Sequence, residues 1–165
     1  MDHVHHHHQP SKHPAAGHVT GESLNRIAAV ATFHCLTGCA IGEVAGLLIG
    51  TYLGWSNLST IALAITLAFI SGFALTTIPF IRRGFGIAAS VKIALAADTA
   101  SITVMEIIDN GLMMLIPGAM DAPIDSLFFW GSMAVSLAIA GVAAYPVNRW
   151  LITRGKGHAL VHSHH

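Results

Sequence analysis

Four long apolar stretches, separated by short polar segments, dominate the pattern of hydrophobic and polar positions along the chain. They run from about residue 24 to 54, 58 to 81, 87 to 116 and 125 to 150. A helix needs roughly 20 apolar residues to cross about 30 Å of hydrocarbon, and each stretch is long enough. The pattern predicts an all-α, polytopic membrane protein: a bundle of four transmembrane helices between two polar tails, residues 1–23 and 153–165.

Composition supports this class. Only 10% of the residues are charged and 53% are hydrophobic, whereas about 25% of the residues of a soluble domain are charged. Eight Lys and Arg balance eight Asp and Glu, so no basic excess indicates a nucleic-acid partner. We therefore expect the lipid bilayer as the main partner, no nucleic acid, and a protein that is not an enzyme.

The positions of the basic residues predict the topology. With four spans, all eight fall on the side of the two termini and the second connection, and none on the side of the first and third connections: Lys12, Arg26, Arg82, Arg83, Lys92, Arg149, Arg154 and Lys156. The positive-inside rule then predicts both termini in the cytoplasm of a bacterium, with the bundle in the inner membrane. The hydrophilic N-terminus lacks the pattern of a cleaved signal peptide.

The two tails are rich in histidine. The chain has twelve His residues, and only His34 lies within a predicted span. Tails with so little apolar surface are predicted to be disordered, and their imidazoles favour a metal-binding role. A purification tag or a neutral low-complexity tail is the alternative explanation.

The first span contains the segment HCLTGCAIGEVAGLLIG, residues 34–50. At about 100° per residue, Cys35, Cys39 and Glu43 follow one face of this helix. Four glycines follow almost the same face: Gly38, Gly42, Gly46 and Gly50. This glycine face predicts tight helix packing, and it could also form a homo-oligomer. Because polar groups at membrane depth are costly, we interpret the thiols and the carboxyl as functional.

The third span is also unusual, because it contains Asp98, Glu106 and Asp109. A helical wheel places Asp98, Met105, Asp109 and Met113 within roughly 80° of one another, with Glu106 at the border. From Asp98 to Asp109 is roughly 16 Å along the axis, so these groups form a ladder of positions and cannot all hold one ion. If the glycine face packs on this acidic face, the two helices enclose a polar seam.

These donors suit transition metals. Thiol and thioether sulfur favour Cu(I), whereas carboxylates and imidazole favour zinc, nickel or cobalt. No organic cofactor is predicted. Packing is the alternative role for the cysteines and methionines, since both types often fill helix cores. The predicted metal-ligating residues are His34, Cys35, Cys39, Glu43, Asp98, Met105, Glu106, Asp109 and Met113.

Around HCLTGCAIGE, and over about residues 27–149, the sequence resembles a family of bacterial multi-pass membrane proteins known as domain of unknown function family 4396. The resemblance implies the four-span fold and makes the polar residues of the first and third spans signature positions. It implies no activity. The paired thiols also look somewhat like those of bacterial mercury and copper uptake proteins, with different spacing, which is an analogy only.

The first functional hypothesis is a transporter or channel for a transition-metal ion, with copper preferred. The thiols would capture the ion, the carboxylates would pass it on or carry a coupled proton, and the tails would buffer it. A membrane redox or haem protein is an alternative, although His34 supplies only one axial ligand per chain. The third hypothesis is a proton or small-cation pathway that uses only the acids of the third span.

Overall fold

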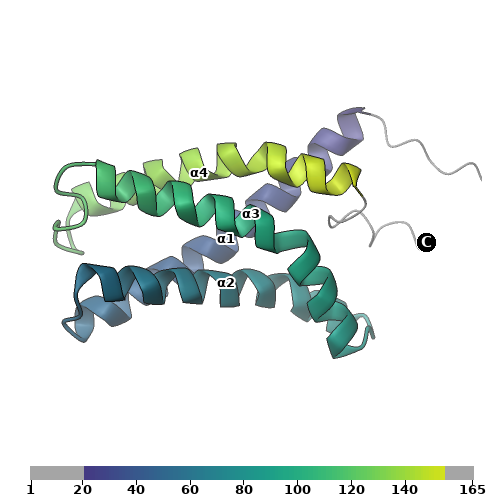
Figure 1. Cartoon of the computed structure of the whole chain (residues 1–165), viewed down its shortest axis with the longest axis horizontal. Coiled ribbons are helices and arrows are strands. Elements are labelled where there is room, and N and C mark those ends of the chain that lie inside the picture. The colour runs from purple at the N-terminus through teal and green to yellow at the C-terminus, as the bar shows by residue number, and fades with distance from the viewer. Residues whose placement is uncertain (1–20, 155–165) are drawn as a thin grey trace, which may run out of the picture.

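The computed structural model describes residues 21–154, and these form four helices. They are α1 (Gly21–Tyr52), α2 (Asn57–Arg82), α3 (Ile87–Leu115) and α4 (Leu127–Thr153), shown in Figure 1. No strand occurs in this range, which confirms the all-α prediction for it. Every helix begins and ends within three residues of its predicted stretch. The predicted His-rich tails lie almost entirely outside the described residues.

The helix ends follow from local sequence. Ser56 and Ser126 are N-caps of α2 and α4, and their hydroxyls accept from the backbone N–H groups of Ser59 and Phe129. Such a bond satisfies one of the free N–H groups of the first turn. The three connections each contain one glycine with a positive φ angle, which other residues rarely adopt: Gly54 at 66°, Gly84 at 90° and Gly118 at 79°.

The glycine face of α1 packs against α2. A Cβ atom added at Gly38 would lie 2.7 Å from the Cα of Gly72, and one at Gly42, Gly46 or Gly50 would overlap α2 as well. The opposing residues are also small, at the same four-residue spacing: Thr60, Ala64, Ala68 and Gly72. The hypothesis that the glycine face meets the acidic face of α3 is therefore wrong, because α2 occupies it. The predicted homo-oligomer through the same face would have to displace α2.

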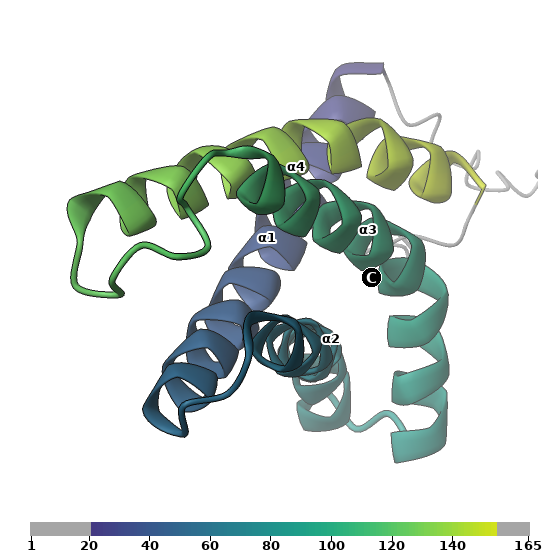
Figure 2. The same ribbon diagram turned by 60° about the vertical axis from the view of Figure 1, so that its left-hand side comes forward.

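The other two helices cover the remaining side of α1. In Figure 2, α3 and α4 run beside each other above the α1–α2 pair, and α3 bends so that its first turns leave α4. We call the end with the α1–α2 and α3–α4 connections the loop end. The opposite end, with the start of α1, the α2–α3 connection and the end of α4, is the terminal end.

The outer surface of the bundle is apolar. Large hydrophobic side chains stand exposed on all four helices, among them Phe33 on α1, Leu58 on α2, Ile107 on α3 and Val142 on α4. Within the described residues, α1, α2 and α4 are long and apolar enough to cross a membrane. These features fit a helical membrane protein. The count differs from the predicted four, because α3 is not among them.

Candidate functional site

The buried polar groups of α1 and α3 face each other in three successive levels. At the level closest to the terminal end, the Cys35 thiol lies 3.8 Å from Oδ1 of Asp98. The Asp98 carboxyl also receives a hydrogen bond from the Thr76 side chain of α2, and His34 lies within electrostatic range. Cys35 and Asp98 are 2% and 1% exposed, so this cluster is shielded from the surroundings.

The next level lies one helical turn closer to the loop end. Here the Cys39 thiol lies beside the Glu106 carboxyl. Asn110 on α3 donates its side-chain amide to Oε2 of Glu106 at 3.3 Å. Met105 belongs to the same core cluster as Cys35 and Cys39. This level therefore adds a thiol, a carboxyl and a thioether to the buried donors.

The third level consists of carboxyls. The side chain of Glu43 adjoins those of Asp109 and Glu106, and all three residues are at most 4% exposed. Within residues 21–154, no backbone, amide or hydroxyl group donates to either carboxyl oxygen of Glu43, so its neighbours are the two other carboxyls. Three buried carboxyls in contact repel one another as anions. They are compatible with burial only when protons or a cation reduce their charge.

Basic side chains do not supply that cation. Every Lys and Arg in the described range is exposed. These residues lie in the first turns of α1 and α3, at the end of α2 and at the end of α4, which are all at the terminal end. A buried charge without a partner is strongly unfavourable. The buried carboxyls therefore need bound protons or a bound cation to reduce their charge.

The structure thus brings together six of the nine predicted site residues in one line between α1 and α3. We call this line the seam, and its members are Cys35, Cys39, Glu43, Asp98, Glu106 and Asp109. Met105 packs with its thiols, and the half-buried His34 lies near its terminal end. The seam forms although the glycine face is turned to α2, because the thiols and Glu43 lie on a neighbouring strip of α1.

Met113 does not join the seam. It packs near the loop end with Ala119, Phe129 and Met133. On the helical wheel Met113 lies at the same angle around α3 as the acids of the seam. At the height of Met113, however, residues of α4 and of the third connection pack against this face of α3. No group of three His, Cys, Asp or Glu side chains in residues 21–154 is arranged to hold one metal ion. Metal ligation by the seam stays a prediction.

Three side chains beside the seam are not among the predicted site residues: Thr76, Ser101 and Asn110. Thr76 of α2 reaches Asp98, and Ser101 of α3 lies beside Cys35. A signal for Thr76 exists in the sequence, since it continues the four-residue spacing of the small stripe of α2 after Gly72. Ser101 lies one turn beyond Ala97 and Asp98 on the buried face of α3, where periodicity alone could have placed it.

Comparison with known proteins gives a family and no relative of known activity. Residues 24–157 match the domain of unknown function DUF4396, and the chain belongs to this family. No curated protein and no solved structure shows significant similarity to the chain.

Proposed function

We propose that this member of the DUF4396 family moves a transition-metal ion across a membrane along the seam between α1 and α3. The observation that carries the proposal is the seam itself: two thiols and four carboxyls, all at most 4% exposed, face one another from two helices. Groups of this kind at membrane depth are costly and typically serve an ion pathway. Because every described Lys and Arg side chain is exposed, none of them neutralises the buried carboxyls, and a cationic substrate can take that role.

The donor types favour copper as the first candidate substrate. Cys35, Cys39 and Met105 share one core cluster, and thiolate with thioether is the donor set that suits Cu(I). Zinc, nickel and cobalt follow, because the carboxyls of Glu43 and Glu106 would also bind these harder ions. On α1 the donors Cys35, Cys39 and Glu43 follow one another at one-turn spacing, which lets an ion pass from one to the next.

The proposal includes α3 as a fourth membrane span. The surface of α3 after its first turns supports this, since its exposed residues from Leu95 onwards are apolar or small. The exposed hydroxyls of Thr99 and Thr103 bond back to the carbonyls of Leu95 and Thr99, so they need no water. All three acids of α3 face the interior. Four spans put both termini on one side, and the positive-inside rule makes that side the cytoplasm.

A double substitution of the thiols tests the proposal. In proteoliposomes that contain the full-length protein and a metal-sensitive dye, Cys35→Ser with Cys39→Ser should lower the initial rate of Cu(I) uptake at least about tenfold, because losing even an outer-shell partner costs about that in affinity. The matched control adds two hydroxyls elsewhere on α1, as Ala40→Ser with Ala45→Ser. Unchanged uptake of Cu(I) and Zn²⁺ by the thiol variant contradicts the proposal.

A proton pathway is the second candidate, and the contact among Glu43, Glu106 and Asp109 favours it. Adjoining carboxyls can exchange protons without any metal ligand. In the same liposomes with a pH-sensitive dye and no metal, this candidate requires a proton flux that Glu106→Gln removes. The thiol variant should retain the flux, as should Glu22→Gln, which changes an exposed acid of α1.

A further inference from the structure

A cavity opens at the loop end of the bundle. Its volume is about 390 Å³. The lining comes from the end of α1, the first and third connections and the starts of α2 and α4, and includes Leu47, Trp55, Asn57, Asp121 and Phe129. Leu47 lies one helical turn beyond Glu43 on α1. The cavity thus reaches to within one helical turn of Glu43, and its lining residues Leu47 and Phe129 also belong to the apolar cluster around Met113.

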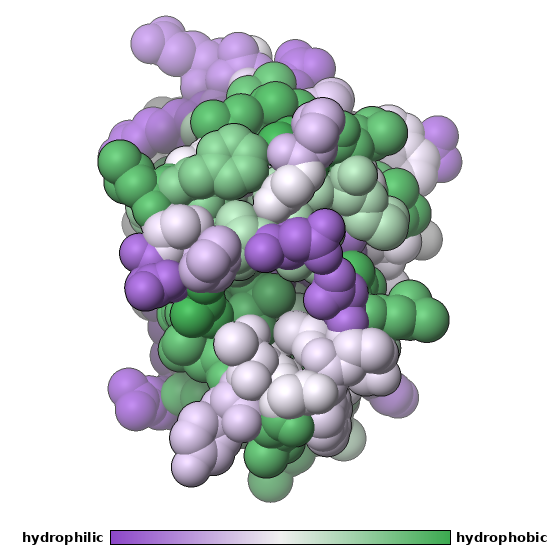
Figure 3. Space-filling model, turned by 90° about the vertical axis from the view of Figure 1, so that its left-hand side faces the viewer, coloured by the Kyte–Doolittle hydropathy of each residue, from purple (hydrophilic) through white to green (hydrophobic). Residues whose placement is uncertain are grey.

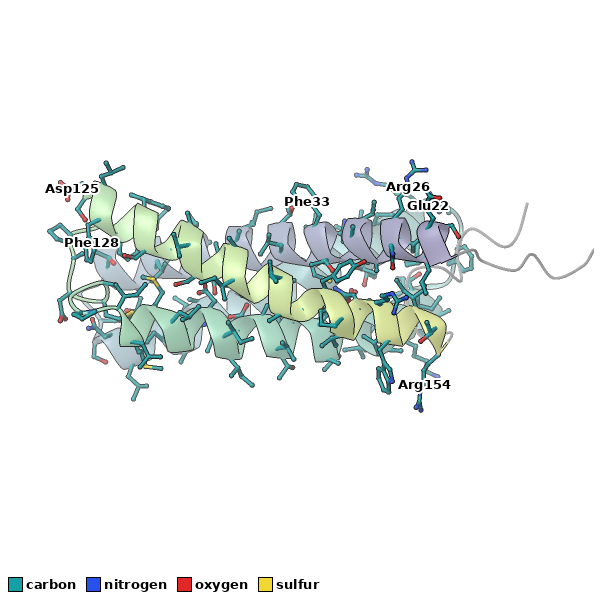
Figure 4. The ribbon with its side chains drawn as sticks, turned by 90° about the horizontal axis from the view of Figure 1, so that it is seen from above. Glu22, Arg26, Phe33, Asp125, Phe128 and Arg154 are labelled. Atoms are coloured by element: carbon teal, nitrogen blue, oxygen red, sulfur yellow. The ribbon has the colours of Figure 1, made fainter. Side chains whose placement is uncertain are left out.

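The charges around this cavity are all of one sign. In the connections at the loop end, residues 53–56 and 116–126, Asp121 and Asp125 are the charged residues. Figure 3 looks onto this end and shows hydrophilic side chains across the middle of the face. Figure 4 shows Arg26 and Arg154 at the opposite end from Asp125. A mouth of one charge sign raises the local concentration of ions of the opposite sign.

Asp121 is the acid that lines the cavity, and Asp125 does not line it. The side-chain amide of Asn57 donates to Oδ1 of Asp121 at 3.3 Å. This bond joins the third connection to the start of α2 and orients the carboxyl. The hydroxyls of Thr51 and Thr60 also lie in the cavity lining. Carboxylate, amide and hydroxyl oxygens are the donors that hard or hydrated cations prefer.

The terminal end of the seam is packed in the same structure. Asn148 of α4 donates to the Thr32 hydroxyl of α1 at 2.9 Å, and both side chains are buried. Arg149 donates to Asn25 at 2.9 Å nearby, and Ile152 packs against Ala28 and Ala31. These contacts join α1 to α4 on the terminal side of Cys35. At the loop end, by contrast, the cavity lining reaches Leu47, one helical turn from Glu43.

We propose that the loop-end cavity is the cation entrance of the seam, and that Asp121 captures a hydrated multivalent cation there through oxygen ligands. This inference rests on the proposed cation pathway and adds to it a binding site and an accessible side. The entrance does not select soft metals. Selection falls to the thiols further along, and capture at the mouth depends on charge.

Terbium luminescence tests the entrance directly. Tb³⁺ binds oxygen donors, and its emission is excited through a nearby indole, which Trp55 supplies in the cavity. In the purified full-length protein, Asp121→Asn should raise the apparent Kd for Tb³⁺ about tenfold, because one of the charges close to a trivalent ion is lost. Asparagine keeps a side-chain oxygen for the Asn57 amide.

Asp125→Asn is the matched control, since it removes the same charge from the same connection outside the cavity. We expect it to change the Kd less than about twofold, as is typical of a charge that contacts no bound ion. Equal weakening by both substitutions, or an unchanged Kd in Asp121→Asn, overturns the inference. The measurement detects binding and not transport, so its outcome does not depend on the result of the thiol experiment.

Discussion

At the scale of single residues, Thr32 has two roles in the packing of α1 on α4. Its hydroxyl donates to the Ala28 carbonyl at 2.8 Å and accepts from Asn148 at 2.9 Å. Thr32 and Asn148 are 8% and 4% exposed, so water does not replace a lost bond. A buried amide without an acceptor retains its full desolvation cost.

Replacing Thr32 by valine keeps the shape of the side chain and removes this acceptor. We expect the free energy of unfolding to fall by about 1 kcal/mol, in line with hydrogen bonds between membrane helices. Reversible unfolding in mixed micelles titrated with sodium dodecyl sulfate measures it. Thr37→Val is the control, because the Thr37 hydroxyl is exposed and bonds only to Phe33 of its own helix. A loss of equal size in both variants would refute the role of the Asn148 bond.

Sequence alone identified the polar residues of the seam because each interrupts an apolar run. The thiols, Glu43 and the acids of α3 all stand out in this way. Asn148 does not, since it lies near the end of its span, where polar residues are common at the membrane interface. Met113 shares the wheel angle of the acids but packs in the loop-end cluster with Phe129 and Met133. A helical wheel gives the direction in which a residue points from the axis of its helix. It does not say which neighbouring helix lies in that direction, because that changes along the axis when helices cross at an angle.

At the scale of helices, two stripes of small residues join α1 and α2. The backbones approach so closely that no side chain fits between them at Gly42, where an added Cβ would overlap Ala68. The matching four-residue spacing of small residues in both spans was readable from the sequence. A helical wheel favours pairing the glycine face with the acidic helix, because the angle of the glycines on α1 almost coincides with that of the thiols. A wheel does not separate neighbouring strips.

Gly42→Ala should force the two helices apart. Overpacking typically costs about 1–3 kcal/mol, so we expect a loss of roughly 2 kcal/mol in the free energy of unfolding. The control is Gly131→Ala in α4, where an added Cβ would meet nothing within 4 Å. Alanine is favoured over glycine in a helix by up to about 1 kcal/mol, so the control should be neutral or stabilising. A destabilised control and an unaffected Gly42→Ala would reverse our account of this interface.

At the scale of the whole molecule, charge is separated along the long axis. The described basic residues gather at the terminal end, and Asp121 and Asp125 are the charged residues of the loop end. This separation agrees with the distribution expected from the positive-inside rule. The number of membrane spans, three or four, decides which ends and connections lie on the same side of the membrane. With four spans, both termini and the α2–α3 connection share one side, whereas with three they cannot all do so.

Topology reporters decide between these counts. We expect a fluorescent protein fused to the C-terminus of the full chain to fluoresce in the bacterial cytoplasm. An epitope inserted after Gly84 should be labelled only after the inner membrane is opened. An epitope inserted after Gly118, at the loop end, should be labelled in cells whose outer membrane alone is permeable. A C-terminal fusion that does not fluoresce, or a Gly118 epitope that is not labelled in those cells, would contradict a four-span bundle.

The close contact between α1 and α2 also bears on how the chain is assembled. During synthesis these two helices emerge first, and we expect their small stripes to let them pair before α3 is complete. The pair then already presents Cys35, Glu43 and Thr76 on one side. A helix with three acids is costly to release into lipid, but it meets polar partners on this preformed hairpin. On the four-span proposal, we therefore expect the α1–α2 hairpin to lower the free-energy cost of inserting α3 into the membrane.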